Sequence, residues 1–407
     1  MKRILSLYSN AFGGLSKEAW LLAVVMFINR SGAMVVPFLS VYLTEAMGFS
    51  LKQVGILLSL FGAGSMCGTF LGGWLTDKIG HFRVQFFSLV LGGSWFFVML
   101  FLKRFELFAG GIFLLSLLTE CLRPANASSV SSYARPENVT RAFSLNRMAI
   151  NLGFSIGPAL GGVLATVSYE FLFMADGLTC LTAGAVFFFY FRHKQGHTPA
   201  PAAAAEATAS LPAARSPYRD GLFVLFSILC CCFAVAFFQF FSTMPLYYRR
   251  VYHLSELQIG ALLASNGLMV FLLEMIIVYL IGDKHALWKM IVAGLLLLAA
   301  AFVLLNLAHG FVVLVFSVLL MSLSEILAMP FMSTLTVQRS GPHNRGSYMA
   351  LYSLSYSAAH IIGPYVGTTV IDNFGFDTLW WGGSALSVVA AVGFYVVVRR
   401  LSAAQLT

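Results

Sequence analysis

Residues 73–83 read GWLTDKIGHFR and close an apolar stretch long enough for a membrane helix. Gly73 allows a neighbouring helix to pack closely, and Gly80 permits a tight turn because glycine has no Cβ. Asp77 stands among basic residues, including Arg83, and can form an ionic latch with the end of a neighbouring helix. The stretch therefore predicts that an apolar helix ends here in a short charged turn.

The composition places this turn in a membrane protein. The 407 residues are 59% hydrophobic and 10% charged, whereas soluble domains carry about 25% charged residues. A surface with so few charges aggregates in water. The net charge of +9 forms no basic stripe with interleaved aromatics, so no nucleic-acid partner is expected. The six cysteines lie in apolar runs and predict neither a disulfide framework nor a metal site.

Twelve stretches of the chain have the length and apolar character of a membrane-spanning helix, which needs about 20 residues. We therefore predict an all-α integral membrane protein. The expected spans lie near residues 19–44, 53–76, 84–102, 107–131, 141–166, 169–191, 220–247, 256–281, 287–307, 310–337, 346–371 and 376–398.

Residues 192–219 interrupt this pattern with a run rich in Ala, Pro and charge, which predicts a flexible cytoplasmic linker. An N-terminal six-helix bundle is expected in residues 1–191 and a C-terminal one in residues 220–407. Features of the two halves recur in the same order at offsets of 205 or 206 residues, which predicts two parallel six-helix repeats. The pairs are Gln53 and Gln258, Asp77-Lys78 and Asp283-Lys284, Pro124 and Pro330, and Gly157-Pro158 and Gly363-Pro364.

The basic residues indicate the orientation of the spans. If both termini are cytoplasmic, 17 Lys and Arg residues lie inside, and cytoplasmic loops are enriched in these residues. Only Lys52, Lys103, Arg104, Arg249 and Arg250 then lie outside. The first span has no small-residue cleavage site and is expected to be retained. We expect a multi-pass monomer of the plasma (inner) membrane, in contact with the lipid bilayer.

The fifth predicted span contains residues 153–162, which read GFSIGPALGG. Its small residues form a groove that admits the backbone of a partner helix, and Pro158 removes a hydrogen bond and permits bending. We expect a helix-packing site on this face. Its small residues are Gly153, Gly157, Gly161 and Gly162.

Three stretches carry a resemblance to a known family. Residues 73–83 resemble the G-x-L-x-D-R/K-x-G-R/K-x-R/K loop motif of the major facilitator superfamily, with His81 where Arg or Lys is usual. Residues 153–162 resemble the G-x-x-x-G-P-x-x-G-G motif of its drug:proton antiporter branch. Residues 344–349, NRGSYM, are similar to the segment entering span 11 in LmrP- and MdtH-like members. The resemblance implies the twelve-helix major facilitator fold and transport by alternating access.

Ionisable residues inside membrane spans are costly and usually functional. Arg30 is expected near the middle of the first span, and Glu120 shares a face of the fourth span with Arg123, three residues later. Glu274 and Glu325 lie within the eighth and tenth spans. Two of the three glutamates can neutralise the two arginines, which leaves one carboxylate to bind and release a proton. The proton is the expected coupling ion, and no other cofactor is expected.

Glu325 is the first candidate for this carboxylate, because Ser324-Glu325-Ile326 resembles the Gly-Glu-Ile segment of span 10 in the same transporters. Glu120 is the second candidate and Glu274 the third. Asp176 of the sixth span either reaches the outer interface or is a further functional candidate. Arg147 near the start of the fifth span either contributes to the site or snorkels to the interface.

The resemblance implies a substrate cavity lined by spans 1, 4, 7 and 10, with spans 2, 5, 8 and 11 at its sides. Polar and aromatic side chains on these spans are the candidate contacts with a small-molecule substrate. They are Asn29, Arg30, Arg123, Asn126, Arg147, Gln239, Asn266, Tyr352, Tyr356 and His360.

Two transport functions remain open. The first is proton-coupled efflux of amphipathic or lipophilic small molecules. The alternative is proton-coupled import of a polar metabolite such as a peptide, a sugar or a siderophore, whose carboxylate Arg30, Arg123 and Arg147 can contact. A scaffold or receptor without transport has no need of intramembrane carboxylates. No nucleotide, hydrolase or metalloprotease motif occurs, so we do not expect an enzyme.

Overall fold

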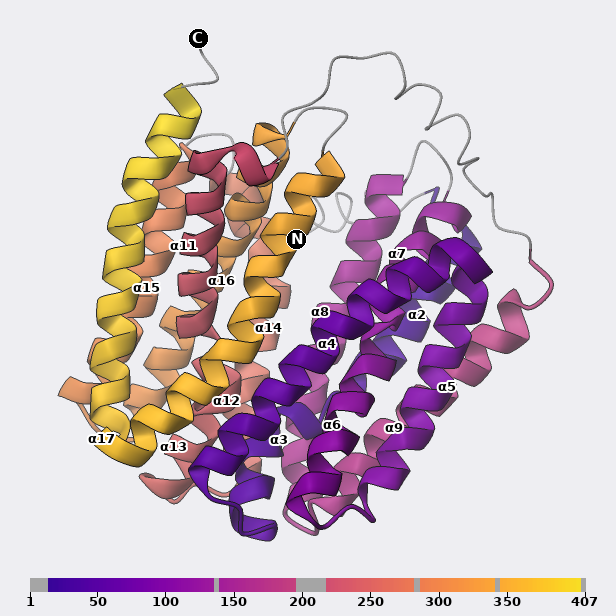
Figure 1. Ribbon diagram of the computed structural model, residues 1–407, viewed down its shortest axis with the longest axis horizontal. Helices are drawn as coiled ribbons and strands as arrows, with labels where there is room; N and C mark the ends of the chain where they lie inside the picture. The colour runs from indigo at the N-terminus through magenta and orange to yellow at the C-terminus, as the bar shows by residue number, and fades with distance from the viewer. Residues whose placement is uncertain (1–13, 135–138, 195–216, 282–285, 341–344, 404–407) are drawn as a thin grey trace, which may run out of the picture. The chain divides into compact units, whose positions relative to one another are not determined.

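The helices of the chain have the lengths that membrane crossing requires (Figure 1). Eleven helices of the described chain are long and apolar enough to cross, and the last of them, Tyr348–Leu401, has 54 residues. It bends at Gly375, whose φ of 83° and ψ of 175° divide it into two spans. The predicted all-α fold with twelve spans is confirmed. The computed structural model describes residues 14–134, 139–194, 217–281, 286–340 and 345–403.

The chain forms two compact units, each of which is described by itself. Unit 1 is Met1–Val36 with Gly64–Ala200, and unit 2 is Pro37–Ala63 with Pro201–Thr407. The end of the first span and the start of the second therefore pack with the helices of unit 2. The predicted domain boundaries at residues 191 and 220 stay a prediction. The central part of the linker, residues 195–216, and the second copy of the turn motif, residues 282–285, lie outside the described residues.

Unit 1 is built on helix pairs that pack through small residues. The first helix, α2, packs against α8 and α9, and α5 packs against α9 (Figure 1). A Cβ added at Gly72 of α4 would lie 2.6 Å from Cys121 Cα, so only glycine permits this approach. The helices of unit 1 are α2 (Lys17–Ser31), the second half of α4 (Leu51–Ile79), α5 (His81–Met99), α6 (Phe105–Glu120), α7 (Leu122–Tyr133), α8 (Val139–Ala165) and α9 (Glu170–Phe191).

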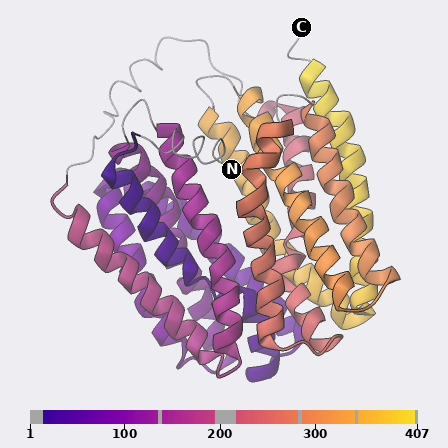
Figure 2. The same cartoon turned by 180° about the vertical axis from the view of Figure 1, so that it is seen from behind.

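Unit 2 contains most of α3 and the helices that follow the linker. Its core pairs α11 with α17, and α15 with α16 and α17 (Figure 2). The fully buried Trp380 stacks on Phe302 with ring centroids 5.6 Å apart. The elements are α3 (Val35–Val41), η1 (Tyr42–Ala46), the first half of α4, η3 (Pro217–Arg219), α11 (Gly221–Phe237), α12 (Gln239–Ser242), α13 (Met244–Arg250), α14 (Glu256–Ile281), α15 (Leu287–Leu307), α16 (Phe311–Arg339) and α17 (Arg345–Ala403).

The same cap begins α4 and α14. The Ser50 N–H donates to Gln53 Oε1 at 3.0 Å, and the Gln53 N–H donates to Ser50 Oγ at 3.3 Å. Ser255 and Gln258 repeat both bonds, at 2.9 and 3.3 Å. This reciprocal capping satisfies two backbone donors at each helix start. The offset of 205 residues read from the sequence therefore corresponds to a repeated local structure.

A network around Asp220 ties three helices of unit 2 together. Asp220 caps α11 and accepts hydrogen bonds from Arg339 Nε at 2.8 Å and from the Tyr348 hydroxyl at 3.1 Å. Burial acts to raise the pKa of Asp220, but Arg339 and the other donors outweigh it and hold this pKa below its usual value. The network therefore stabilises the ionised carboxylate.

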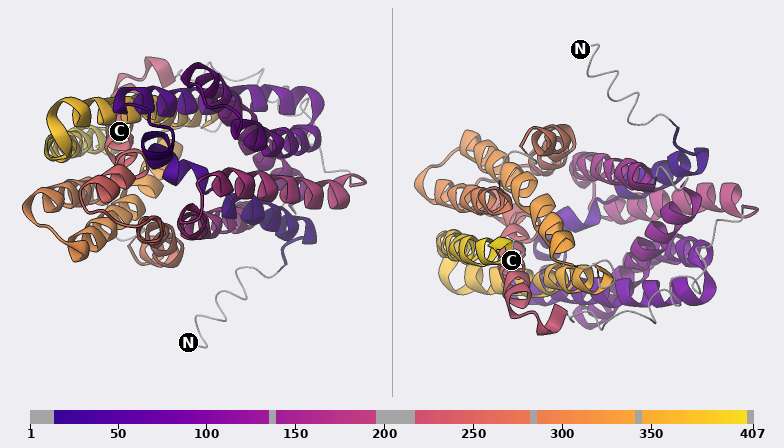
Figure 3. Two further views of the ribbon diagram at one scale, coloured as in Figure 1. Left: turned by 90° about the horizontal axis from the view of Figure 1, so that it is seen from below. Right: turned by 90° about the horizontal axis from the view of Figure 1, so that it is seen from above.

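Three spans are broken within their apolar regions. The first breaks between α2 and α3, the fourth at Cys121 between α6 and α7, and the seventh where α11, α12 and α13 follow one another. Pro124 lies in the first turn of α7, where a missing N–H removes no helical bond. Figure 3 shows the helices from below and from above. Broken helices leave backbone groups that neighbouring side chains must satisfy, and the polar side chains gather beside them.

Candidate functional site

Arg30 lies in the last turn of α2, just before the break in the first span. Its guanidinium stands over the Phe154 ring of α8, 5.4 Å from the centroid. Its Nε is buried and has no hydrogen-bond partner in the described part of the chain. Arg30 also lies within electrostatic range of Glu120 and Arg123. The structure thus brings together three of the residues that the sequence singled out.

The glycine stripe of α8 makes room for Arg30. A Cβ added at Gly153 would lie 2.7 Å from Arg30 Cβ, and one added at Gly157 would lie 2.9 Å from the Ala33 carbonyl oxygen. Pro158 lies inside α8, which continues through it. Gly161 and Gly162 are buried further along the same helix. The small residues therefore let α8 pack against the backbone of α2 at Arg30.

Glu120 and Arg123 flank the break in the fourth span. Glu120 Oε2 lies 3.0 Å from Arg123 Nη2, and the Glu120 side chain is 11% exposed whereas that of Arg123 is 65% exposed. Asn126, three residues after Arg123, is buried, and its Oδ1 has no hydrogen-bond partner within the described residues. Arg147 is exposed on α8. The predicted pairing of Glu120 with Arg123 is therefore present.

Asp176 is buried inside the protein, with 3% of its surface exposed. Its carboxylate binds protein groups. Its Oδ1 accepts the Met34 N–H at 3.0 Å and its Oδ2 accepts the Val35 N–H at 3.2 Å. These two N–H groups belong to the start of α3, which the break in the first span leaves without helical partners. The position of Asp176 along its span suggested the membrane interface. The break between α2 and α3 explains its burial, because the N–H groups freed there need an acceptor.

Asn29, next to Arg30, donates through Nδ2 to Cys180 Sγ at 3.2 Å. The sulfur belongs to α9, one turn beyond Asp176. All six cysteines are free. Asn29 thus packs between α2 and α9, and its amide binds a protein atom in this structure.

Glu325 lies half-buried on α16 beside α14 in unit 2. Asn266 Nδ2 donates to Glu325 Oε2 at 3.2 Å and to Ser322 Oγ at 3.0 Å. Ser322 in turn donates to the Val318 carbonyl at 2.8 Å. Glu274 lies half-buried two turns further along α14 than Asn266. The amide therefore fixes the position of the first-choice carboxylate.

Three of the candidate residues form a row on α17. Tyr352 donates to the Tyr356 hydroxyl at 3.1 Å, and Tyr356 donates to Met332 Sδ at 3.5 Å. His360 stacks on Phe238 with centroids 3.7 Å apart. Tyr356 lies within electrostatic range of Glu325. The row thus extends the polar surface around Glu325.

Gln239 sits in the break of the seventh span and is 3% exposed. Its Nε2 donates to the Gly363 carbonyl at 2.9 Å and to the Val235 carbonyl at 3.0 Å. Its Oε1 accepts from Thr243 Oγ1 at 3.0 Å. Gln239 therefore bonds to the protein through both ends of its amide.

The turn after α4 has the predicted glycine at its tightest point. Gly80 has a φ of 85°, a conformation that L side chains rarely adopt. A Cβ added at Gly73 would meet nothing within 4 Å, so the close approach expected there occurs at Gly72 instead. Asp77 and Arg83 are exposed, and Asp77 makes no ion pair within the described ranges. The ionic latch stays a prediction.

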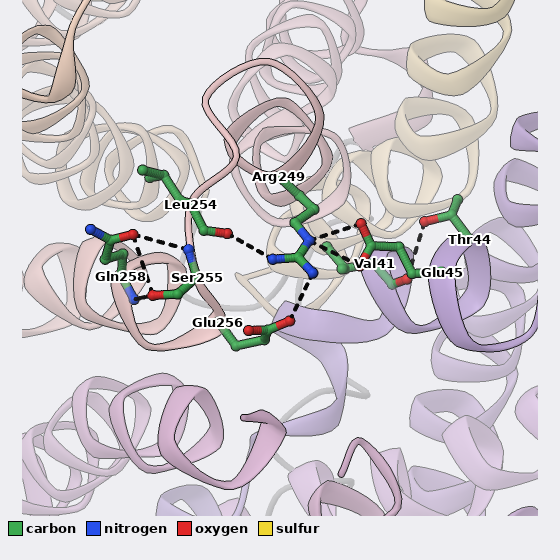
Figure 4. Close-up of polar contacts among 8 residues, drawn as sticks. All are labelled: Val41, Thr44, Glu45, Arg249, Leu254, Ser255, Glu256 and Gln258. Atoms are coloured by element: carbon green, nitrogen blue, oxygen red, sulfur yellow. Dashed lines mark hydrogen bonds and ion pairs between the residues drawn. The ribbon is translucent and has the colours of Figure 1, made fainter. Parts of the chain in front are cut away.

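A further cluster joins the end of the first span to the start of α14 (Figure 4). Arg249 Nε lies 2.9 Å from Glu45 Oε1 and its Nη2 lies 3.3 Å from Glu256 Oε1, while Nη1 donates to the Leu254 carbonyl at 3.1 Å. The sequence identified Arg249 only as a marker of topology. Its partner Glu45 lies 204 residues earlier in the chain, so no local pattern indicated the pair of Glu45 with Arg249.

No group of three or more His, Cys, Asp or Glu residues is arranged to hold a metal ion in the ranges that the structure describes. The chemistry of the two polar clusters is that of charge and hydrogen bonding. In unit 1, one glutamate pairs with Arg123 and lies within electrostatic range of Arg30, and in unit 2, one glutamate accepts from an amide and lies within electrostatic range of Tyr356.

Comparisons with known proteins agree on one family. The model of the Major Facilitator Superfamily matches residues 19–357 and again residues 250–406. The MFS-type transporter YttB of Bacillus subtilis (strain 168) is 23% identical over 389 residues, which cover 95% of this chain and 96% of that protein. A Na(+), Li(+), K(+)/H(+) antiporter of Planococcus maritimus is 23% identical over 88% of this chain and 91% of its own length.

A crystal structure of a POT family transporter in complex with 5-aminolevulinic acid shares the fold. Its TM-score is 0.79 at 15% sequence identity, over 96% of this chain and 98% of that one. The family match covers far more than half of the sequence, and the all-helical structure agrees with it. The chain belongs to the Major Facilitator Superfamily and is a secondary transporter with multiple membrane-spanning helices.

Proposed function

We propose that this transporter is a proton-coupled antiporter of the drug:proton type, which exports amphipathic or lipophilic small molecules by alternating access. The observation that carries the proposal is the Glu325 carboxylate, held in an apolar helix by the Asn266 amide at 3.2 Å. An amide has both donors and an acceptor, so it can hydrogen-bond to the ionised and to the protonated carboxyl group. Glu325 can therefore change its charge without losing this contact.

A carboxylate at this depth couples protonation to conformation. Enclosure in a low-dielectric surrounding disfavours the ionised form, whereas contact with water favours it. If Glu325 is enclosed in one state of the transport cycle and hydrated in the other, proton binding shifts the equilibrium between these states. Inward movement of protons then drives substrate outward.

One relative that matches most of the chain supports antiport. The Planococcus maritimus protein is named as an antiporter that exchanges cations for protons, and it matches 88% of this chain. The span-5 motif supports the same branch by its resemblance, and its Gly153 packs against the Cβ and backbone of Arg30. The basic residues support a plasma (inner) membrane location with both termini cytoplasmic, and we expect the monomer to be the transporting form.

The experiment is substrate flux from proteoliposomes under an imposed proton gradient. Liposomes that contain the full chain are loaded with ethidium, rhodamine 6G or 1-pyrenebutyrate, and the external solution is then acidified. We expect faster loss of at least one probe when protons can flow inward, together with alkalisation of the external medium. Glu325→Gln should abolish the acceleration by the gradient and leave downhill exchange intact, because the glutamine cannot release a proton.

Glu106→Gln is the matched control, since Glu106 lies in the first turn of α6 at the surface. It should keep the wild-type response. Gradient-driven flux that survives in Glu325→Gln would remove this residue from coupling. Accumulation of a di- or tripeptide inside the liposomes, driven by inward protons, would contradict export and support the importer.

A further inference from the structure

The charges of unit 1 do not balance around the break in the first span. Arg30 and Arg123 lie within electrostatic range of each other and of Glu120. Glu120 already forms an ion pair with Arg123 at 3.0 Å. Within electrostatic range of Arg30, two arginines thus share one carboxylate, which leaves an excess positive charge among these three groups.

Asp176 is another carboxylate of this unit, but its oxygens bind backbone groups rather than Arg30. Both of its oxygens accept backbone N–H groups, from Met34 at 3.0 Å and from Val35 at 3.2 Å. The described residues contain no ion pair between Arg30 and any carboxylate, and Arg30 Nε has no hydrogen-bond partner among them. A buried donor of this kind is costly unless it acquires a partner.

The surroundings of Arg30 indicate what that partner is. A guanidinium presents a planar set of donors that fits a carboxylate or a phosphate with two parallel hydrogen bonds. The Phe154 ring on one side of it offers an apolar surface. Arg123 is 65% exposed at its side chain, so its remaining donors are accessible. These features together suit an organic anion with an apolar body.

We propose that Arg30, with Arg123 beside it, binds the anionic group of an amphiphilic substrate of this transporter. The proposal rests on the proposed function for its assumption that the substrate is amphipathic, and it adds the sign of the substrate's charge. The carboxylate or phosphate of the substrate then binds the terminal nitrogens of the guanidinium and neutralises the excess charge, while the apolar body of the substrate packs near Phe154.

Equilibrium binding tests the proposal without a proton gradient. The full chain is placed in phosphatidylcholine nanodiscs and titrated with three probes that share the pyrene ring and a four-carbon chain: 1-pyrenebutyrate, 1-pyrenebutanol and 1-pyrenebutylammonium. We expect the wild type to bind the carboxylate at least ten-fold more tightly than the alcohol, and to bind the ammonium most weakly. Arg30→Gln should remove this preference, whereas Arg30→Lys should keep part of it because the positive charge remains.

Arg104→Gln is the matched control, because Arg104 is an exposed arginine of the same unit, at the start of α6. It should bind like the wild type. Unchanged affinity of Arg30→Gln for the alcohol shows that the variant is folded. Equal wild-type affinities for carboxylate and alcohol, or a carboxylate preference that survives in Arg30→Gln, would overturn the proposal.

The two proposals fail in different ways. Proton-driven efflux of ethidium or rhodamine 6G, with no preference for the anionic probe in binding, would sustain antiport and refute the anion site. A ten-fold preference for 1-pyrenebutyrate that depends on Arg30, with flux that ignores the proton gradient, would sustain the anion site and refute the coupling.

Discussion

The contact of α8 with α2 in unit 1 and the contact of α17 with α11 and α12 in unit 2 use the same Gly-Pro pair, 206 residues apart. Gly157 and its neighbour Gly153 meet the backbone around Arg30, and Gly363 meets Val235 and Gln239. Gln239 bonds to the protein through both ends of its amide, whereas Arg30 Nε has no partner in the described chain. The same helix packing thus supports a satisfied polar group in one unit and an unsatisfied charge in the other.

This difference separates structural from functional polar groups. A buried polar side chain whose bonds are all made within the protein stabilises the fold, and its loss is expected to cost stability. A buried charge with an unmade bond costs stability in the ligand-free protein and is retained for what it binds. Variants at the two contacts can therefore be compared directly.

The largest effect is expected from adding one methyl group to each glycine contact. Gly153→Ala places a Cβ 2.7 Å from Arg30 Cβ, so the helices must separate, at a cost of about 1–3 kcal/mol in the free energy of unfolding. Gly363→Ala places its Cβ 3.5 Å from the Val235 carbonyl oxygen, which is an ordinary contact, and alanine favours the helix. Thermal unfolding in detergent should show a lower midpoint for Gly153→Ala only. Equal losses at both sites would mean that the contacts are equally tight.

A smaller effect is expected from replacing the two polar side chains. Gln239→Leu removes the side-chain hydrogen bonds to the Gly363 carbonyl and from the Thr243 hydroxyl, and it should lower the free energy of unfolding by about 1–2 kcal/mol. Arg30→Met removes a buried charge, keeps the Glu120–Arg123 pair and should leave the stability unchanged or raise it. Chemical unfolding of both variants in the same detergent measures the difference. A strong loss of stability in Arg30→Met would assign Arg30 to the structure instead.

The sequence predicted the fold well because apolar length and glycine position are local properties. The spans, the Gly80 turn and the ion pair of Glu120 with Arg123 follow from residue spacing along one helix. The bond from Asp176 to the start of α3 was not predictable, because it depends on where the first span breaks and on which residue of α9 faces the break. The pair of Glu45 with Arg249 was hidden for the same reason, since its members belong to distant segments.

The site residues divide in the same way. The sequence identified Arg30 and Glu325 as costly charges within apolar spans, and this needs no knowledge of packing. It gave no reason to treat Gln239 differently from Asn266, because both are amides in expected cavity helices. Only the contacts distinguish them: Gln239 bonds to backbone carbonyls, whereas Asn266 donates to the carboxylate of Glu325.

The smallest effect is expected at Asp220, a second satisfied group of unit 2, and it appears only in acid. Because Arg339 and the other donors hold the pKa of Asp220 below its unfolded value of about 4, the folded state gains stability from this group at any pH above that value. This contribution is lost as the pH falls below about 4, through the folded pKa, because protonation then removes the charge that Arg339 binds.

Thermal midpoints between pH 6 and pH 3 measure this loss, and Asp220→Asn should flatten the acid part of the curve because the amide does not titrate. Arg30→Met should keep the wild-type slope, since Arg30 lies in unit 1 and is not among the groups that set the pKa of Asp220. If Asp220→Asn follows the wild-type curve throughout, the network at the start of α11 does not stabilise the ionised form. A flattened curve in Arg30→Met would instead mean that the acid dependence arises in unit 1. The contrast between the hydrogen-bonded polar groups of unit 2 and the unpartnered Arg30 Nε of unit 1 would then not hold.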